Sequence, residues 1–328
     1  LKVSEKRMEN EFFRIQWDDF GRFTRVYDKL EEREVLAPGR KGNVWQLFED
    51  RPAEHDAWDF DANFEENTWE PGKAESIEIL EKGPVRAVVR ILRRTEKSTF
   101  TQDITMYAAS PRIDVRCSVD WHEKRVLLKV AFPVNIRSTR ATYDIQFAAI
   151  ERATHANTAV EHARFEVTAH QWADLSEADY GVGLLNDCKY GYDVRDNVLR
   201  LSLLRAPVDP DPRADEGRHI FTYALLPHCG SWREELLEEG YKLNAPLLVY
   251  PIEGPAENRV GEALEPAGTL ITVDAENIIV DTVKKAEDSQ AVIVRLHEAF
   301  GRRGKVQVLF RTEPKAVYEC DLMEEKDK

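Results

Sequence analysis

The chain has 328 residues, 42% of them hydrophobic, and its 60 acidic and 46 basic side chains give a formal net charge of −14. This length allows about two domains, and the apolar fraction is sufficient for a sizeable core. The negative charge repels phosphate backbones and anionic lipid surfaces, so we expect neither nucleic acid nor a membrane as a partner. No segment approaches the ~18 consecutive apolar residues of a membrane span.

The two ends of the chain and its cysteines indicate whether it is part of a longer protein and in which compartment it is found. It begins at Leu1 without an initiator Met and ends in a charged run, DLMEEKDK, so we expect a piece of a longer protein. The four cysteines show no CxxC pair and no metal-ligand spacing: Cys117, Cys188, Cys229 and Cys320. Such sparse cysteine usage favours a reducing compartment, and we expect a cytoplasmic location.

Strand periodicity dominates the chain. Residues 113–121 are apolar at every odd position and polar at the even ones, which predicts a half-buried strand. Residues 126–134 alternate with the opposite parity after a short polar turn, which predicts an antiparallel hairpin. Further strands are expected at 85–92, 100–106, 198–204, 292–296 and 305–310. Many strands with turn signals between them predict an all-β fold of stacked antiparallel sheets.

Helix signals are sparse, and one break stands out. Residues 231–240 begin with Ser, continue with several Glu and end with Gly, which predicts one short helix. Pro, Gly and Glu accumulate over residues 246–266. We therefore expect a large first domain over residues 1–250 and a smaller, truncated β domain over residues 251–328.

The motif HDAWDFD places one His and three Asp within seven residues, which are types that bind metals. In a strand, however, His55 and Asp59 would share one face while Asp56 lies on the other. The motif is therefore only a weak indication of a metal site. The interpretation we favour is a loop in which Asp56 and Asp59 accept backbone hydrogen bonds and Trp58 packs against a neighbouring surface.

The segment ERATHANT combines a fixed cation with neutral hydrogen-bonding side chains. Arg152, His155 and Asn157 would suit the hydroxyls of a neutral sugar. The alternative is a polar loop whose Thr and Asn side chains satisfy its own backbone. On the residues alone, the second interpretation is favoured.

The segment NDCKYGYD places Asp187, Lys189, Tyr190 and Tyr192 around Gly191. Aromatic faces stack on a pyranose ring while Asp and Lys bind its hydroxyls. The alternative is a tight turn in which Gly191 supplies a special dihedral angle and the tyrosines cover the sandwich edge. The residues favour neither interpretation over the other.

Four stretches, taken together, resemble one enzyme family. They are LFEDRPAEHDAWDFDANFE (residues 47–65), YDIQFAAIERATHANTAVEHARFEV (143–167), the segment from Tyr180 to His228, and VKKAEDSQAVIVRLHEAFG (283–301). In these stretches the chain resembles the C-terminal region of glycoside hydrolase family 38, the α-mannosidases. The resemblance covers most of the chain. It implies a supersandwich, the galactose-mutarotase-like pair of broad antiparallel sheets, followed by a smaller C-terminal β-sandwich.

The resemblance also implies where the chemistry lies. In that family a zinc ion and the catalytic carboxylates belong to an N-terminal domain, so no catalytic residue, metal ligand or bound zinc is expected in this chain, which should be inactive alone. Its expected partners are that catalytic domain and a mannose-containing glycan, and oligomerisation stays open.

The resemblance places Arg152 at the rim of the active site. We add four rim candidates by position, namely His155, Asn157, Asp187 and Tyr190. Candidates for the interface with the catalytic domain are Asp56, Trp58 and Asp59, and we expect Trp58 and Trp69 to lie in an exposed apolar patch.

Two other classes of function remain open at this point. A free-standing carbohydrate-binding module would bind sugar through the loop near Tyr190. A self-sufficient lyase or epimerase on the same sandwich fold would need its own Tyr, His or carboxylate catalyst in a groove. The sequence contains no HExxH, GxSxG, GxxxxGK[ST] or GxGxxG motif.

Overall fold

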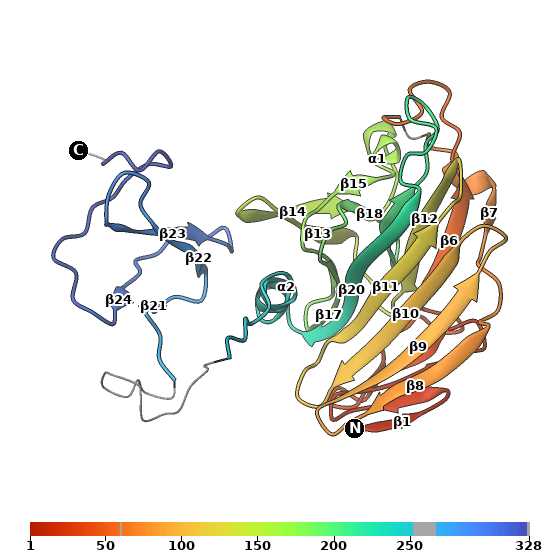
Figure 1. Ribbon diagram of the computed structural model, residues 1–328, viewed down its shortest axis with the longest axis horizontal. Helices are drawn as coiled ribbons and strands as arrows, with labels where there is room; N and C mark the ends of the chain where they lie inside the picture. The colour runs from red at the N-terminus through yellow and green to blue at the C-terminus, as the bar shows by residue number, and fades with distance from the viewer. Residues whose placement is uncertain (60, 252–266, 327–328) are drawn as a thin grey trace. The chain divides into compact units, whose positions relative to one another are not determined.

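The structure is a computed structural model and describes residues 1–59, 61–251 and 267–326 (Figure 1). It divides into two compact units. The first contains Leu1–Ile145 and Ile150–Pro246, and the second contains Gln146–Ala149 and Leu247–Lys328. The sequence led us to expect the boundary between residues 250 and 251. No helix in the described residues is long and apolar enough to cross a membrane.

Three sheets form the first unit (Figure 1). The nine-stranded sheet has the order β14 (Ala148–Ala153), β13 (Arg140–Ile145), β16 (Trp172–Ser176), β17 (Tyr180–Asn186), β20 (Gly217–Cys229), β11 (Ile113–Trp121), β10 (Thr99–Tyr107), β9 (Arg86–Arg94), β8 (Ser76–Lys82). The six-stranded sheet has the order β15 (Val167–Thr168), β18 (Gly191–Arg195), β19 (Val198–Arg205), β12 (Val126–Pro133), β6 (Val44–Glu49), β7 (Thr68–Trp69). The five-stranded sheet has the order β1 (Lys2–Ser4), β2 (Arg7–Glu9), β3 (Phe13–Trp17), β4 (Phe23–Asp28), β5 (Arg33–Glu34).

The core of the first unit lies between the nine-stranded and six-stranded sheets. Trp45 of β6 meets Phe100 of β10 edge-on, with 5.3 Å between ring centroids. Phe132 of β12 meets Tyr223 of β20 in the same way at 6.2 Å. Both pairs join strands of different sheets, so the two sheets pack face to face through their apolar sides. The all-β class and the large antiparallel sandwich are confirmed.

The expected hairpin between residues 113–121 and 126–134 is wrong. Strand β11 pairs with β10 and β20, whereas β12 pairs with β6 and β19 in the other sheet. The turn between β11 and β12 therefore crosses from one sheet to the other. Both edges of β11 are occupied, and the reversed parity turns the apolar residues of β12 toward the same core from the opposite side.

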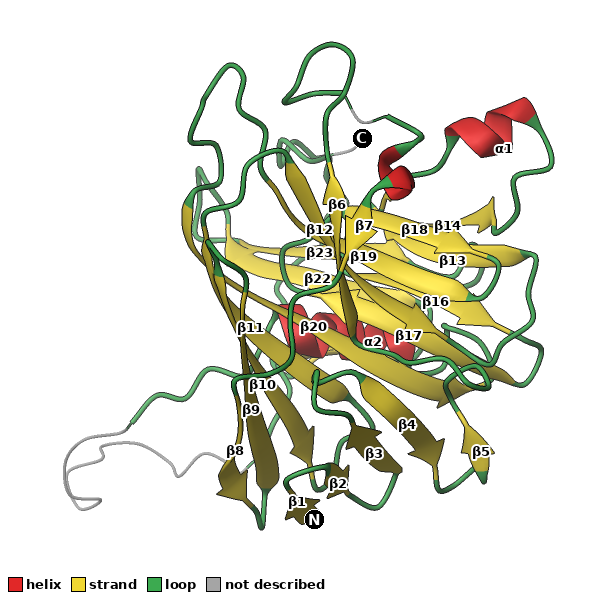
Figure 2. Ribbon diagram, turned by 90° about the vertical axis from the view of Figure 1, so that its right-hand side faces the viewer, coloured by secondary structure: helices red, strands yellow, loops and turns green. Residues whose placement is uncertain are grey.

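The expected helix over residues 231–240 begins and ends later, as α2 (Leu236–Asn244). Ser231 does not cap it, because its hydroxyl donates to Glu234 Oε2 at 2.7 Å. The helix packs on β17 (Figure 2), where Gly183 leaves room for Leu236: a Cβ at Gly183 would lie 2.2 Å from Leu236 Cδ1. The first unit also contains α1 (Ala159–Ala163) and the 3₁₀ turn η1 (Phe64–Glu66).

The described part of the second unit consists mainly of two antiparallel strand pairs. Strand β21 (Ile271–Val273) pairs with β24 (Val308–Phe310), and β22 (Ile278–Lys285) pairs with β23 (Val292–Glu298). The expected strand over 305–310 is therefore shorter than predicted. The Pro- and Gly-rich run that led us to place the domain boundary lies largely outside the described residues.

Candidate functional site

Arg152 lies on β14, the edge strand of the nine-stranded sheet. Two hydrogen bonds of Thr154 hold the backbone just after Arg152 in place. The buried Thr154 donates its hydroxyl to Ser138 O at 2.9 Å, and its carbonyl accepts a hydrogen bond from Asp196 N at 2.8 Å. The end of β14 is thus a fixed base for the side chains that follow.

The guanidinium of Arg152 is half-buried and has no carboxylate partner among the described residues. It lies 4.6 Å above the ring of Tyr143, a cation–π contact. Its Nη1 is buried without a hydrogen-bond partner in the described part of the chain. Burial lowers the pKa of Arg152, and the nearby Arg164 lowers that pKa further. An unsatisfied buried donor costs about 1–3 kcal/mol, so an acceptor brought to this nitrogen would be bound favourably.

His155 and Asn157 are placed by the start of α1. The helix has a complete capping box: Thr158 Oγ1 accepts a hydrogen bond from Glu161 N at 3.2 Å, and Glu161 Oε2 accepts one from Thr158 N at 2.9 Å. His155 Nδ1 lies 3.3 Å from the same Glu161 oxygen, and Asn157 is exposed. We expected a loop here, although the sequence contains the Thr-x-x-Glu signature of a helix start.

The NDCKYGYD segment begins with a side-chain-stabilised turn. Asn186 Oδ1 accepts hydrogen bonds from the backbone of the next residues, including Cys188 N at 2.9 Å. Asp187 Oδ1 accepts from Thr222 N at 2.9 Å, so one carboxylate oxygen holds β20 in place. Tyr190 is 58% exposed and lies edge-on to His170 at 5.7 Å.

The explanation of Gly191 by a special dihedral angle is wrong, because this glycine does not have a positive φ. A Cβ there would lie 2.6 Å from Glu166 Oε1 and 3.0 Å from Ser202 Cβ, so a larger residue would require these side chains to move. Tyr192 does not cover the sandwich edge either: it is fully buried and donates to Leu184 O at 3.2 Å. Among the described residues, no hydrogen bond, ion pair or ring contact joins Asp187 or Tyr190 to the Arg152 segment.

A buried ion cluster on the outer face of the six-stranded sheet was not predicted. Lys129 of β12 has no exposed side-chain surface and contacts the carboxylates of Glu166 and Asp193. Arg200 of β19 binds Asp193 at 2.7 Å and also contacts Glu65. Burial raises the pKa of Glu166, and Lys129 opposes that shift. The alternation of residues 126–134 predicts that Lys129 faces solvent. Alternation carries no information about the distant segments that cover this face of the sheet.

The HDAWDFD segment is fastened to the end of β19. Asp56 Oδ2 accepts hydrogen bonds from Val208 N at 2.6 Å and Asp209 N at 3.1 Å, which confirms its expected role. Asp59 instead contributes its backbone carbonyl, which accepts from Arg205. Trp58 is 72% exposed and Trp69 of β7 is 41% exposed. In the residues that the structure describes, no group of three or more His, Cys, Asp or Glu could hold a metal ion.

Comparisons with known proteins decide the family. The model of the glycosyl hydrolases family 38 C-terminal domain matches residues 8–213, and that of the family 38 C-terminal beta sandwich domain matches residues 277–328. The chain belongs to glycoside hydrolase family 38. The suspected resemblance and the smaller C-terminal β-sandwich are therefore confirmed.

The relatives are α-mannosidases and much longer. Over 326 residues the chain is 39% identical to alpha-mannosidase 2C1 of Mus musculus, covering 98% of this chain and 31% of that protein. It is 38% identical over 333 residues to alpha-mannosidase G of Dictyostelium discoideum, covering 97% and 30%. The crystal structure of an α-mannosidase from Enterococcus faecalis has the same fold, with a TM-score of 0.77 at 17% identity, over 99% of this chain and 40% of that one. The chain thus spans about 30% of the length of these curated relatives.

Proposed function

We propose that this chain is the non-catalytic C-terminal part of a retaining α-mannosidase that hydrolyses terminal α-linked mannose. The zinc ion and the pair of catalytic carboxylates of such an enzyme would belong to an N-terminal domain outside these 328 residues. The small share of each α-mannosidase relative that the chain covers supports this division. The four free cysteines support a cytoplasmic location as part of the same proposal.

The unsatisfied Nη1 of Arg152 carries the proposal that this chain lines the active site. A half-buried guanidinium on an edge strand, without a carboxylate from the described chain, is suited to an acceptor from outside it. In the complete enzyme that acceptor would be a hydroxyl of the mannoside. Asn157 and Tyr190 are exposed and stay candidates for this rim, whereas Asp187 uses one carboxylate oxygen to hold β20. His155 is turned toward Glu161.

The outward-facing Trp58 is the best candidate for contact with the catalytic domain. Arg205 donates to the carbonyl of Asp56, and the Asp56 carboxylate accepts from Val208 N. These hydrogen bonds hold the loop that carries the exposed indole. Trp69 adds a second partly exposed indole. Exposed aromatic side chains on a fixed support are typical of an interface between domains. Asp59 shares this loop and is assigned to the same interface.

The test is Arg152→Ala in the complete enzyme, assayed with an aryl α-mannoside. We expect kcat/KM to fall about ten- to a hundredfold, because one hydrogen bond from a charged donor is lost. The melting temperature should stay close to that of the parent enzyme. The matched control is Arg140→Ala on the neighbouring strand, where a 66% exposed Arg lies 3.6 Å from Glu151. A lowered melting temperature with unchanged kcat/KM per folded molecule would make Arg152 structural.

A free-standing carbohydrate-binding module is the alternative, and the exposed ring of Tyr190 is the observation in its favour. This function requires that the chain bind sugar through that ring without a catalytic partner. Loss of sugar binding in Tyr190→Ala, measured on the chain alone, would support the module.

A further inference from the structure

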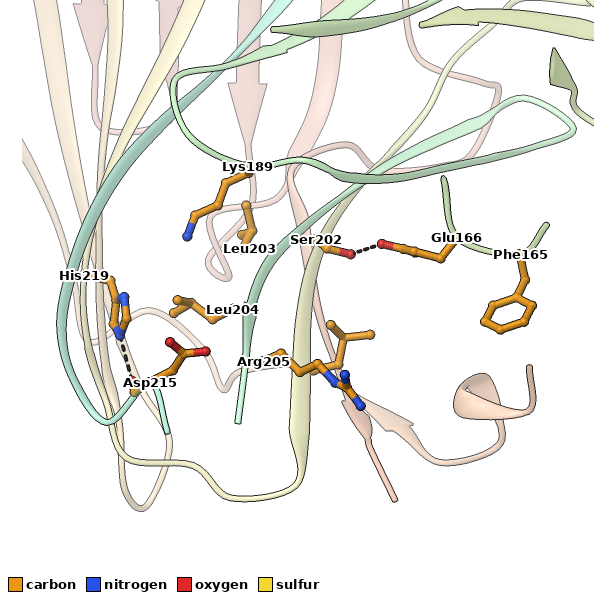
Figure 3. A pocket seen from close by; sticks show the side chains of 10 residues that line it. Phe165, Glu166, Lys189, Ser202, Leu203, Leu204, Arg205, Asp215 and His219 are labelled. Atoms are coloured by element: carbon orange, nitrogen blue, oxygen red, sulfur yellow. Dashed lines mark hydrogen bonds between the residues drawn. The ribbon is translucent and has the colours of Figure 1, made fainter. Parts of the chain in front are cut away.

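A pocket of about 460 Å³ opens in the first unit, and Arg152, His155 and Asn157 are not among its lining residues (Figure 3). Its lining comes from β12, β19, β20 and three connecting segments: Leu127, Phe165, Glu166, Lys189, Ser202, Leu203, Leu204, Arg205, Asp215, His219. The volume lies within the range of about 300–1,000 Å³ that is usual for small-molecule sites. Lys189 belongs to the NDCKYGYD segment, which the sequence indicated for sugar binding, and none of the other lining residues was a site candidate.

The topology explains why the pocket forms here. The last pair between β18 and β19 is Tyr192 with Leu201, yet β19 continues to Arg205. The last pair between β17 and β20 is Asn186 with Tyr223, yet β20 begins at Gly217. Two strands of opposite sheets therefore extend past their neighbours at the same place. The sheets no longer close there, and the space between the two strand ends becomes the pocket.

The lining combines an apolar wall with polar groups of both signs. Leu203 and Leu204, together with Leu127, form apolar surface. The carboxylates of Glu166 and Asp215 oppose the cations of Lys189 and Arg205, so the formal charge of the lining sums to zero. A charged ligand would thus gain nothing from the net charge of the pocket.

Three of these polar groups offer hydrogen bonds to a ligand in the pocket. His219 Nε2 donates to Asp215 O at 2.7 Å, which leaves Nδ1 as an acceptor in the neutral ring. Lys189 Nζ lies 4.6 Å above the ring of Phe221, and Figure 3 shows its ammonium pointing toward His219 and Asp215. In the described part of the chain, neither Lys189 nor the Asp215 carboxylate forms an ion pair.

We propose that this pocket, which Arg152 does not line, binds a small neutral polyhydroxylated ligand of the size and chemistry of a monosaccharide. The apolar face of a pyranose would lie on the leucine wall. Its hydroxyls would accept from Lys189 and donate to Asp215 and His219. This proposal goes beyond the proposed mannosidase function and does not depend on it, because it concerns binding and not hydrolysis.

The test is a ligand-observed NMR titration of the purified chain with methyl α-D-mannopyranoside, methyl β-D-glucopyranoside and mannitol. Mannose 6-phosphate and mannosamine serve as anionic and cationic probes of similar size. We expect saturable binding of at least one neutral probe at millimolar concentration. The charged probes should bind more weakly than the neutral one.

The deciding variant is Asp215→Gly. Asp215 has a φ of 58°, which Gly adopts without strain, so the change removes the carboxylate and leaves the backbone intact. The matched control is Asp196→Gly, because Asp196 is an exposed Asp with a φ of 51° outside the pocket. We expect about tenfold weaker binding in Asp215→Gly and no change in the control. Lys189→Met should weaken binding in the same way.

Four outcomes would overturn the proposal. They are no saturable binding of any neutral probe, tighter binding of either charged probe, equal weakening by the two Gly variants, and binding that survives both pocket variants but disappears in Tyr190→Ala. The last outcome would assign the sugar to the exposed aromatic loop. None of these measurements involves turnover, so each result stands whether or not the mannosidase proposal holds.

Discussion

The buried carboxylate of Glu9 is expected to contribute to the stability of the first unit. It lies at the end of β2, is 6% exposed, and accepts a hydrogen bond from Arg14 Nε at 2.9 Å. Arg7 also donates to it, and Lys29 Nζ lies 3.2 Å away. The hydrogen bond from Arg14 is the main cause that lowers the pKa of Glu9 to about 2. Its charged form is therefore favoured by the fold.

We predict that Glu9→Gln lowers the free energy of unfolding on the order of 1 kcal/mol at pH 7, a modest value because both arginines are partly exposed. The folded pKa lies below the ordinary value of 4.5. The contribution of Glu9 is thus complete above pH 4.5 and is lost as the pH falls toward 2. Urea unfolding across this range should show the difference between parent and variant shrinking with acidification. Glu11→Gln, an exposed neighbour, is the control, and a pH-independent difference would contradict the argument.

At the residue scale, the sequence indicated the right types of group but not their contacts. The free donor of Arg152 depends on Tyr143 below it and on the lack of a carboxylate in the described chain around it. Lys129 and Glu166 come together only because the segment before β15 folds over β12. Neither contact lies within the few residues over which sequence periodicity acts.

At the scale of elements, strand bounds were predictable and strand partners were not. The alternation of residues 113–121 coincides with β11, and that of 126–134 with β12 apart from its last residue. Alternation reports which side of a strand is apolar. It does not report which sheet the strand joins, so the expected hairpin was wrong although both of its strands were right.

A prediction at this scale concerns the charge on the outer face of β12. Lys129→Met should lower the free energy of unfolding by about 3–5 kcal/mol, because it leaves the carboxylates of Glu166 and Asp193 buried without their shared cation. Denaturant unfolding monitored by circular dichroism would measure this change. The control is Lys124→Met, an exposed lysine in the connection that precedes β12. A loss below 1 kcal/mol would mean that water solvates these carboxylates.

At the scale of the whole molecule, residue patterns predicted an all-β sandwich, and the family resemblance supplied the supersandwich arrangement. Patterns alone could not choose among sandwich topologies, because pairs such as β11 with β20 join residues about a hundred positions apart. The order of motifs along the chain carried that information instead. Neither the residue patterns nor the family resemblance predicted the pocket between β19 and β20. The pocket depends on where these two strands extend past their neighbours.

The last prediction is that the isolated chain hydrolyses no aryl α-mannoside and retains no stoichiometric zinc after dialysis. A catalytic zinc needs about three protein ligands and one open position, and the described residues bring together no such group of His, Cys, Asp or Glu. Elemental analysis and a chromogenic assay with added zinc would measure both quantities. The complete enzyme, assayed in parallel, is the positive control. Turnover by the isolated chain that depends on zinc and stops with a chelator would place the active site within these residues. The proposal that a separate N-terminal domain carries the catalytic residues would then be wrong. Arg152 would have to be reassessed as part of a complete active site within this chain.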